Sequence, residues 1–393
     1  LLRVIASVDP ATGGPVAGLR AITPELTKLG HETEFLTVDD PAADFLKNPI
    51  ARVHACGPAV NSYAHSPRVR LWLREHSGNY DAIIVHGLWQ DLGRAVRKVC
   101  TERHQPYFVF PHGMLDPTLH KTYRFRHFKK WVYWLLVEGR VLREARAVFF
   151  TCEEERRLAR ESFPLYSVSE CVVKYGASTP PSDVAAIATQ SAEVRRTPKS
   201  YWLFLGRIHS KKGIELLLGA YGRLLANLSF EERSSLPRLV IAGPCHDLRY
   251  LEQLKNQAVA NGIAERVEWP GMLSGDAKWR ALANAETFVL PSYQENFGIA
   301  VAESLAAGTP VLLSERVNIW KEIVGDGAGL VAPPTEAGTL DLLQRWRRLS
   351  SEDRESMRSA AKRCFQSRFE ISAVAVDFAD KLSTLIRRPV SAA

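Results

Sequence analysis

Hydrophobic and polar positions along the chain form two alternating patterns, one typical of strands and one typical of helices. This alternation occurs in both halves of the chain. Short apolar runs have the length and β-branched content of buried strands, and segments with an apolar residue every three or four positions follow them as helices. In the first half the predicted strands are Arg3–Val8, Glu34–Val38, Ala82–His86, Tyr107–Pro111 and Ala147–Thr151. Strands that alternate with helices predict a parallel sheet covered by helices.

The alternation of predicted strands and helices is interrupted between residues 176 and 199 and then resumes. This stretch is rich in Ser, Thr, Ala and Pro and is predicted to be a linker. The strands predicted after it are Tyr201–Leu205, Arg238–Ala242, Arg266–Trp269, Thr287–Leu290 and Pro310–Leu313. We therefore predict an α/β fold of two Rossmann-like domains, residues 1–180 and 181–365. Parallel sheets bind ligands at the carboxyl ends of their strands, which predicts a cleft between the two domains.

Composition removes several classes of protein. The 393 residues are 46% hydrophobic and 24% charged, which is typical of globular domains. No run of about 18 apolar residues predicts a membrane span, and the opening apolar run is too short for a signal peptide. The six cysteines are scattered, without a C-x-x-C pair or histidines at metal-ligand spacing. We expect reduced cysteines, no metal site and a cytoplasmic location.

The strongest functional pattern lies in the second half, where residues 291–298 read Pro-Ser-Tyr-Gln-Glu-Asn-Phe-Gly between a strand and a helix. Gly298 allows close approach of a ligand to the backbone, and the start of the helix offers N–H groups to a phosphate. Glu295 and Glu303, eight residues apart, can accept hydrogen bonds from sugar hydroxyls. The alternative is a charge at the helix terminus followed by a solvated glutamate.

A second loop, Gly-Arg-Ile-His-Ser-Lys-Lys-Gly at 206–213, also joins a strand to a helix. Arg207 offers a rigid fork of donors and Lys212 a point charge, so that the two side chains can hold a diphosphate without a metal. The alternative is an ordinary polar loop with surface lysines.

Together these motifs resemble those of retaining glycosyltransferases with the GT-B fold, specifically glycosyltransferase family 4. The resemblance covers nearly the whole chain and includes Ala-Ala-Gly-Thr-Pro-Val at 306–311. It implies that Arg207 and Lys212 bind the diphosphate of a nucleotide-sugar donor, that Glu303 binds the ribose and that Glu295 contacts the donor sugar. It also implies backbone contacts from Asn296, Phe297 and Gly298, and nucleobase contacts near Gly243 and Met272. The family usually has glycine where this chain has Asn296.

In the first half the resemblance adds a glycine loop and a histidine. Gly13 and Gly14 match the loop that approaches the donor phosphate, and His112 matches an active-site histidine that contacts the donor sugar. His86 follows the preceding strand in a similar position, and Trp89 and Asp116 are candidates for contact with the acceptor. Each of these features has a simpler alternative, namely a tight turn or a histidine satisfied by neighbouring backbone. The family also implies that residues 366–393 form a helix crossing back to the first domain.

Most of the excess positive charge lies in one segment. The formal net charge of the chain is +8, and residues 120–146 hold eight Lys or Arg against two Glu, together with six aromatic residues. Basic and aromatic residues at helical spacing suit an anionic membrane surface. The alternative is a helix that packs its aromatic face on the sheet. No motif predicts a nucleic-acid partner.

The leading hypothesis is a metal-independent, retaining glycosyltransferase of bacterial type without a cofactor. It would move a sugar from a nucleotide-diphosphate sugar to a glycan or lipid-linked acceptor, at the inner face of the cytoplasmic membrane. The acceptor hydroxyl would attack the donor sugar on the same face from which the phosphate leaves. The leaving phosphate would accept the proton of that hydroxyl. Alternatives are a GT-B nucleotide-sugar epimerase and a non-catalytic nucleotide-sugar-binding protein. A dehydrogenase is disfavoured because no G-x-G-x-x-G motif opens either half.

Overall fold

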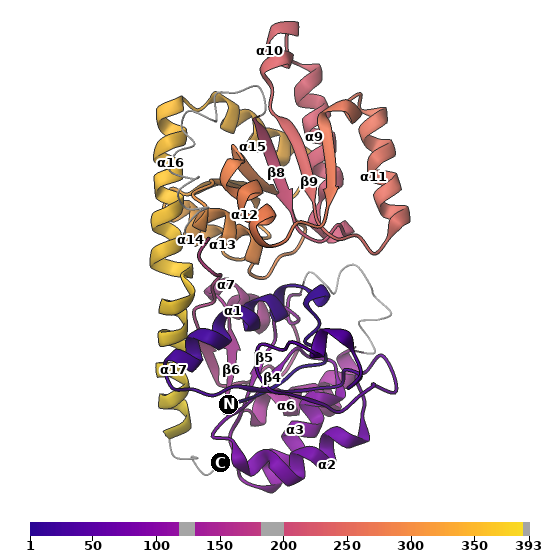
Figure 1. The fold of residues 1–393 in the computed structure, drawn as a ribbon, viewed down its shortest axis with the longest axis vertical. Helices are drawn as coiled ribbons and strands as arrows, with labels where there is room; N and C mark the ends of the chain where they lie inside the picture. Colours follow the sequence, from indigo (N-terminus) through magenta and orange to yellow (C-terminus); the bar gives the residue numbers. More distant parts are fainter. Residues whose placement is uncertain (118–129, 182–199, 388–393) are drawn as a thin grey trace. The chain divides into compact units, whose positions relative to one another are not determined.

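A computed structural model describes residues 1–117, 130–181 and 200–387 of the chain (Figure 1). The chain forms two compact units, Leu1–Gly176 with Ile371–Ala393, and Ala177–Glu370. Each unit is built on one parallel sheet. Most of the predicted linker, residues 182–199, lies outside the described residues.

The sheet of the first unit has seven parallel strands in the order β3-β2-β1-β4-β5-β6-β7. Their bounds are β1 Leu2–Val4, β2 Glu34–Thr37, β3 Val53–Ala55, β4 Ile83–His86, β5 Tyr107–Phe110, β6 Ala147–Phe150 and β7 Glu170–Val172. The first strand ends four residues before the predicted end at Val8, and the chain then enters the loop leading to α1 (Gly14–Lys28). The strands β3 and β7, at the two edges of the sheet, were not predicted.

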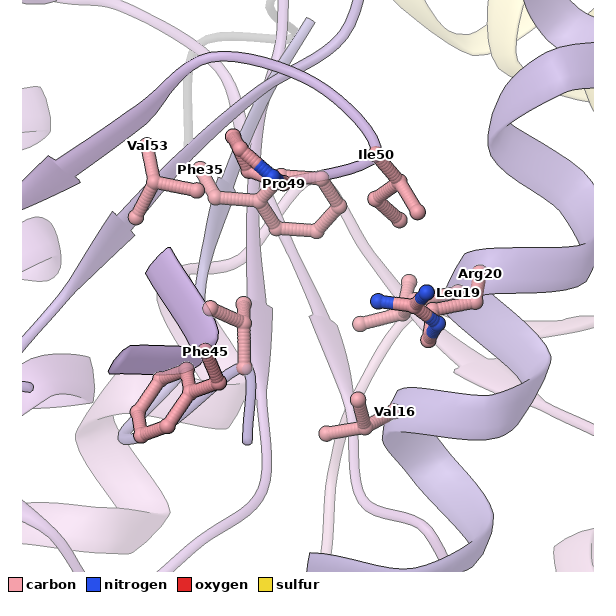
Figure 2. A pocket seen from close by; sticks show the side chains of 9 residues that line it. Val16, Leu19, Arg20, Phe35, Phe45, Pro49, Ile50 and Val53 are labelled. Carbon is pink, nitrogen blue, oxygen red and sulfur yellow. The ribbon is translucent and has the colours of Figure 1, made fainter. Parts of the chain in front are cut away.

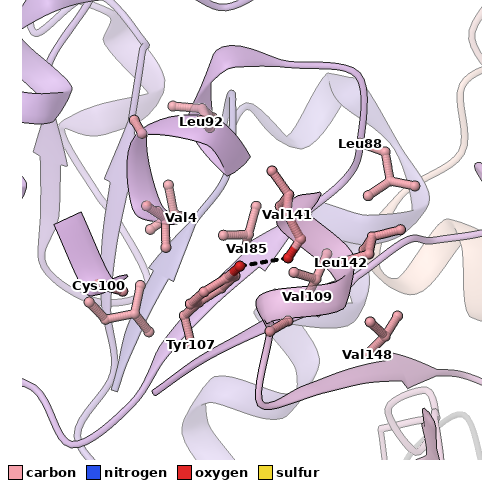
Figure 3. Packing of buried hydrophobic residues seen from close by; sticks show 14 of the residues in the cluster. Val4, Val85, Leu88, Leu92, Cys100, Tyr107, Val109, Val141, Leu142 and Val148 are labelled. Carbon is pink, nitrogen blue, oxygen red and sulfur yellow. Dashed lines mark hydrogen bonds between the residues drawn. The ribbon is translucent and has the colours of Figure 1, made fainter. Parts of the chain in front are cut away.

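Alternation along the strands gives this sheet two different cores. Leu2 and Val4 face a core shared with α2 (Pro67–His76), α3 (Asp91–Glu102) and α6 (Gly139–Glu144). Figure 3 shows this packing and the hydrogen bond of 2.6 Å from the Tyr107 hydroxyl to the carbonyl oxygen of Val141. The opposite face packs on side chains of α1 and α17 (Ile371–Arg387). The last helix of the chain is therefore part of the first unit's core.

The second unit has six parallel strands in the order β10-β9-β8-β11-β12-β13. Their bounds are β8 Tyr201–Leu205, β9 Arg238–Ala242, β10 Val267–Gly271, β11 Thr287–Leu290, β12 Val311–Ser314 and β13 Gly329–Ala332. The helices relevant to the site are α9 Ile214–Ala226, α11 Leu248–Ala260, α12 Gly275–Asn284 and α13 Ile299–Ala306. Five of the six strands were predicted, and the sixth, β13, is an edge strand.

Residues 366–393 were expected to form a helix, and within the described residues that helix, α17, begins only at Ile371. Helix α16 (Ser351–Cys364) runs into a π-helical turn at Phe365–Phe369, and Glu370 then adopts an extended conformation before α17 begins. Within the first unit, Lys381 Nζ of α17 donates a hydrogen bond of 3.0 Å to the carbonyl oxygen of Val172.

Candidate functional site

The predicted site residues follow the carboxyl ends of strands in both units. In the first unit, Gly13 and Gly14 come after β1, and His112 comes after β5. In the second unit, Arg207 and Lys212 follow β8, Gly243 follows β9, and Met272 follows β10. The stretch Glu295–Gly298 follows β11, and Glu303 lies inside α13.

The two motif loops of the second unit are packed directly on each other. Gly213, which lies between a short 3-10 turn and α9, has a φ of +66°, and a Cβ atom there would overlap the carbonyl oxygen of Pro291. Across the same contact, the Ser292 hydroxyl donates a hydrogen bond of 2.9 Å to the carbonyl oxygen of Lys211. Glycine at 213 is therefore required by both the backbone conformation and the close approach of the loops.

Lys212 and Glu295, one from each motif loop, form an ion pair between Nζ and Oε2. Their side chains are 20% and 17% exposed, so solvent screening of this pair is reduced. Arg207 is exposed, and no residue in the described ranges hydrogen-bonds or ion-pairs with its guanidinium. Burial, together with the cations of Arg207 and Lys211, lowers the pKa of His209. The loop thus carries positive charge next to one carboxylate.

The turn after Glu295 is held by backbone and amide hydrogen bonds. Glu295 N donates to the carbonyl oxygen of Arg316 at 2.9 Å, and Asn318 Nδ2 donates to Asn296 Oδ1 at 3.3 Å. The Phe297 side chain is 4% exposed and packs edge-on against Phe369, with ring centres 5.6 Å apart. Phe297 therefore belongs to the core, and its backbone is what it offers to a ligand.

Glu303 in α13 pairs with a lysine that the sequence did not single out. Lys278 Nζ, from α12, lies 2.5 Å from Glu303 Oε1. Burial raises the pKa of Glu303, and the opposing attraction of Lys278 favours the ionised form. No motif identifies Lys278, because its partner comes from a different helix.

The backbones of three neighbouring loops meet beside these residues. Gly243 N donates to the carbonyl oxygen of Gly271 at 2.7 Å, and a Cβ atom at Gly243 would overlap the carbonyl oxygen of Gly206. Met272, the next residue after β10, is 62% exposed. Gly243 thus touches the start of the loop at 206–213, and Met272 directly follows Gly271, whose carbonyl oxygen Gly243 contacts.

In the first unit, Gly13 has a φ of +103° and caps α1, whose first residue is Gly14. A Cβ atom at either position would meet no atom within 4 Å. Backbone conformation, rather than crowding, favours glycine at 13, and the space beside both glycines is open to a ligand.

His112 occupies a turn with a φ of +51°, a conformation rare for residues other than glycine. The next residue fixes this turn, because Gly113 N donates to Glu155 Oε1 at 2.6 Å, and Thr151 N donates to Glu155 Oε2 at 2.7 Å. Glu155 lies in α7 (Glu153–Arg160) and is buried. It was not predicted, since three adjacent glutamates at a helix start resemble ordinary helix-terminal charge.

Two further side chains continue from His112 into the unit. His86 Nδ1 lies 2.9 Å from His112 Nε2, and Arg3 Nη1 lies 3.2 Å from His86 Nε2. Burial, and then the Arg3 cation, lowers the pKa of His112 to about 3 and that of His86 well below its usual range. Both rings are therefore neutral near pH 7. Arg3 was not predicted as a site residue, and the only feature of the sequence that could have identified it is that it is a lone charged residue in an apolar strand.

Trp89 and Asp116, the candidates for contact with the acceptor, each form a backbone hydrogen bond within this unit. Trp89 has a φ of +66°, and its backbone N–H donates to Glu138 Oε2 at 3.2 Å. Burial raises the pKa of Glu138 to about 8. Asp116 is buried beside the His112 turn, where its N–H donates to the carbonyl oxygen of Gly113 at 3.2 Å. Glu138 was not predicted.

An apolar pocket in the first unit lies between α1, β2 and the chain leading to β3 (Figure 2). Phe35, Phe45 and Val53 line it, with Arg20 on the α1 side. None of the predicted site residues lines this pocket, so it is not part of the candidate site.

The basic segment is described only from residue 130, because residues 118–129 lie outside the described residues. Trp134 is buried and stacks on Phe163 with ring centres 4.8 Å apart. On the same stretch Trp131, Val132, Leu135 and Leu136 are 37–64% exposed. The stretch therefore packs one face on the unit and leaves other apolar side chains in water.

Within the described ranges, no helix combines the length and apolar character needed to cross a bilayer. Over the same ranges, no three His, Cys, Asp or Glu side chains gather as a potential metal site.

Both halves of the chain match known family models. Residues 13–176 match the glycosyl transferase 4-like domain, and residues 187–363 match glycosyl transferases group 1. An uncharacterised glycosyltransferase of Methanocaldococcus jannaschii is 39% identical over 132 residues, which is 34% of this chain and 31% of that protein. The O-antigen chain mannosyltransferase B of Escherichia coli is 31% identical over 142 residues, 36% of this chain and 35% of that protein. The matches thus span about a third of these relatives.

Solved structures match over nearly the full chain. Sucrose-phosphate synthase from Thermosynechococcus elongatus has a TM-score of 0.77 at 17% identity, covering 98% of both chains. The Anabaena protein HepE in complex with UDP and glucose has a TM-score of 0.72 at 16% identity, covering 98% of this chain and 99% of HepE. These likenesses confirm the predicted fold class.

Proposed function

We propose that this chain, a GT-B protein with a glycosyl transferase 4-like first domain and a glycosyl transferases group 1 second domain, is a retaining glycosyltransferase. Its donor is a nucleoside-diphosphate sugar and its acceptor a glycan or lipid-linked sugar. The observation that carries the proposal is the contact between the two motif loops, where Lys212 pairs with Glu295 and the loop of Lys212 also carries the exposed Arg207. The named complex of the similar Anabaena protein with UDP and glucose supports a donor of this class.

The second unit supplies the groups that the departing diphosphate requires. Arg207 and Lys212 stabilise the negative charge that develops on the leaving phosphate, which is electrostatic stabilisation of the transition state. Binding of the diphosphate gives Lys212 a second anionic partner besides Glu295. The Glu295 carboxylate then accepts hydrogen bonds from hydroxyls of the donor sugar, and Glu303 accepts them from the ribose.

In the proposed reaction, the acceptor hydroxyl oxygen forms a bond to the anomeric carbon while the bond from that carbon to the phosphate oxygen breaks. The released phosphate oxygen takes the proton of the acceptor hydroxyl, so the products are the glycoside and a nucleoside diphosphate. Attack on the face that the phosphate leaves preserves the anomeric configuration. His112 hydrogen-bonds to the donor sugar, and the two cationic side chains make a metal unnecessary.

The experiment measures transfer and donor hydrolysis with a panel of nucleoside-diphosphate sugars. Arg207→Ala, Lys212→Ala and Glu295→Ala should each lower kcat/KM about a hundredfold or more while the protein stays folded. The wild type should keep its full turnover in the presence of a chelator. Lys255→Ala, an exposed lysine on α11, is the matched control and should behave as wild type. Near-normal turnover in all three site variants would refute the assignment. Conversion of the donor without an acceptor or hydrolysis would indicate an epimerase.

We also propose that the acceptor is met at an anionic membrane surface through residues 130–146. The support is the row of exposed apolar side chains Trp131, Val132, Leu135 and Leu136, which adjoins Lys130 and precedes three arginines at 140, 143 and 146. Exposed apolar groups bordered by basic residues are typical of helices that lie in the headgroup region.

A further inference from the structure

Arg3 and His86 lie in the adjacent strands β1 and β4, and His112 lies in the turn that follows the next strand, β5. The order β1-β4-β5 brings them together, with Arg3 paired in register with Ile84 and His86 with Phe110. Because Leu2 and Val4 face the opposite core, alternation turns Arg3 to the face that packs on α17.

The Arg3 guanidinium is enclosed in a way that packing alone does not explain. The residue is 2% exposed, and its Cζ lies 5.3 Å from the centre of the Phe378 ring of α17. Its Nε and Nη2 atoms are buried and have no hydrogen-bond partner within the described ranges. Burial lowers the pKa of Arg3 to about 10, so the group remains cationic near pH 7. A buried cation without a carboxylate partner is costly, and an apolar side chain would fill this place with less penalty.

The contacts of Arg3 determine where the two imidazole protons lie. A guanidinium can only donate, so His86 Nε2, 3.2 Å from Arg3 Nη1, must carry a lone pair. A neutral His86 then carries its proton on Nδ1, and this N–H donates to His112 Nε2 at 2.9 Å. His112 Nε2 is therefore the acceptor, and the proton of the neutral ring is on Nδ1. Within the described ranges no other group hydrogen-bonds to the His112 ring.

We propose that Arg3 is a positioning residue that, through His86, fixes the His112 proton on Nδ1. His112 thereby presents a permanent N–H donor, and the group it selects is an oxygen acceptor such as a sugar hydroxyl. The choice of the donor sugar as that ligand rests on the proposed function, whereas the tautomer does not. Reversing the His112 tautomer alone would place two N–H groups between the rings, and reversing both tautomers would turn the His86 Nε2–H against the Arg3 guanidinium.

The first test needs no substrate, and it uses variants only to assign the signals. Nitrogen-15 NMR of the histidine-labelled protein distinguishes protonated from unprotonated ring nitrogens, with His86→Asn and His112→Asn used to assign the two rings. Between pH 6 and 8, both rings should be neutral, with the proton on Nδ1. A His112 ring protonated on Nε2, or on both nitrogens, would overturn the proposal even if the protein transfers sugar as proposed.

The second test compares two replacements of Arg3. Arg3→Lys keeps a group that only donates, and should keep the nitrogen-15 pattern and a kcat within about threefold of wild type. Arg3→Met fills similar space without a donor, and should give a mixture of His112 tautomers and a kcat lowered at least about tenfold, with little change in the donor KM. If Arg3→Met lowers the melting temperature but keeps the wild-type nitrogen-15 pattern, Arg3 is only structural and the proposal fails. Absence of transfer in the wild type refutes the proposed function and leaves the tautomer test valid.

Discussion

Glu138 is a carboxylic acid that is 1% exposed, with the backbone N–H of Trp89 donating to it at 3.2 Å. Burial raises its pKa from 4.5 to about 8. The folded protein therefore holds a proton that the unfolded chain releases above pH 4.5. The stabilising contribution is complete below pH 4.5 and is lost as the pH rises through about 8.

Replacing this acid should remove that pH dependence. Glu138→Gln keeps the oxygen that accepts the Trp89 N–H and cannot ionise. Between pH 5 and 8.5 the wild type should lose stability relative to the variant by about 1 kcal/mol for each pH unit crossed. Chemical unfolding of both proteins at a series of pH values measures this difference. Parallel stability curves would show that Glu138 is not protonated in the fold.

At the residue scale, the sequence predicts a side chain best when it sits in a continuous motif. Lys212 and Glu295 were predicted in this way as site residues, and the structure shows that they form an ion pair. Arg3, Lys278 and Glu155 were not, because each acts on a group from another strand or helix. The positive φ at His112 was equally hidden, since nothing in the sequence Phe-Pro-His-Gly-Met requires it.

Among the elements, the 3-10 turn and glycine before α9 hold the two motif loops together. Gly213 and Gly262 have the same φ of +66°, but a Cβ atom would overlap Pro291 only at 213 and would be in open space at 262. Alanine at either position pays the same backbone strain of about 1–2 kcal/mol. Only Gly213→Ala must also separate the loop of Lys212 from the loop of Glu295.

Gly262→Ala is thus a matched control for Gly213→Ala. We expect the free energy of unfolding to fall by about 1–2 kcal/mol in the control and by more in Gly213→Ala. Calorimetric titration with UDP and GDP should show weakened binding only in Gly213→Ala. Equal binding by both variants would mean that the contact of the two loops does not shape the nucleotide site.

The strands that the sequence missed are β3, β7 and β13, and all three lie at sheet edges. Interior strands of a parallel sheet are covered on both faces and read as continuous apolar runs, whereas edge strands are partly exposed. All three residues of β3 and of β7 are only half-buried. The break at Glu370 was missed for another reason, since no glycine or proline marks it.

For the whole molecule, the alternation of strands and helices in both halves of the sequence was enough to predict two parallel α/β domains. Each interior strand is specified by its own short apolar run. The distribution of charge is a second property at this scale. Most of the net charge of +8 lies in residues 120–146. The described part of this segment also carries the exposed Leu136. Membrane attraction should therefore be local rather than spread over the surface.

Co-sedimentation with phosphatidylglycerol vesicles tests this. Wild type should bind, and added salt should release it. Leu136→Glu, at a side chain 64% exposed, should weaken binding about tenfold. Leu248→Glu, at an equally accessible leucine of α11 (72% exposed), should leave binding unchanged. Binding that is absent or insensitive to salt would remove the membrane proposal.

The position of α17 in the first unit has a consequence for biosynthesis. A ribosome completes residues 1–176 and then makes all of the second unit before Phe378 and its neighbours emerge to cover Phe108, Phe110 and Phe149. At 5–20 residues per second this interval is about 10–40 seconds. The nascent first unit spends that time with the α17 side of one sheet face uncovered, so the later unit can finish folding first. Chaperone dependence during translation is the expected cost of joining the two ends of the chain in one core.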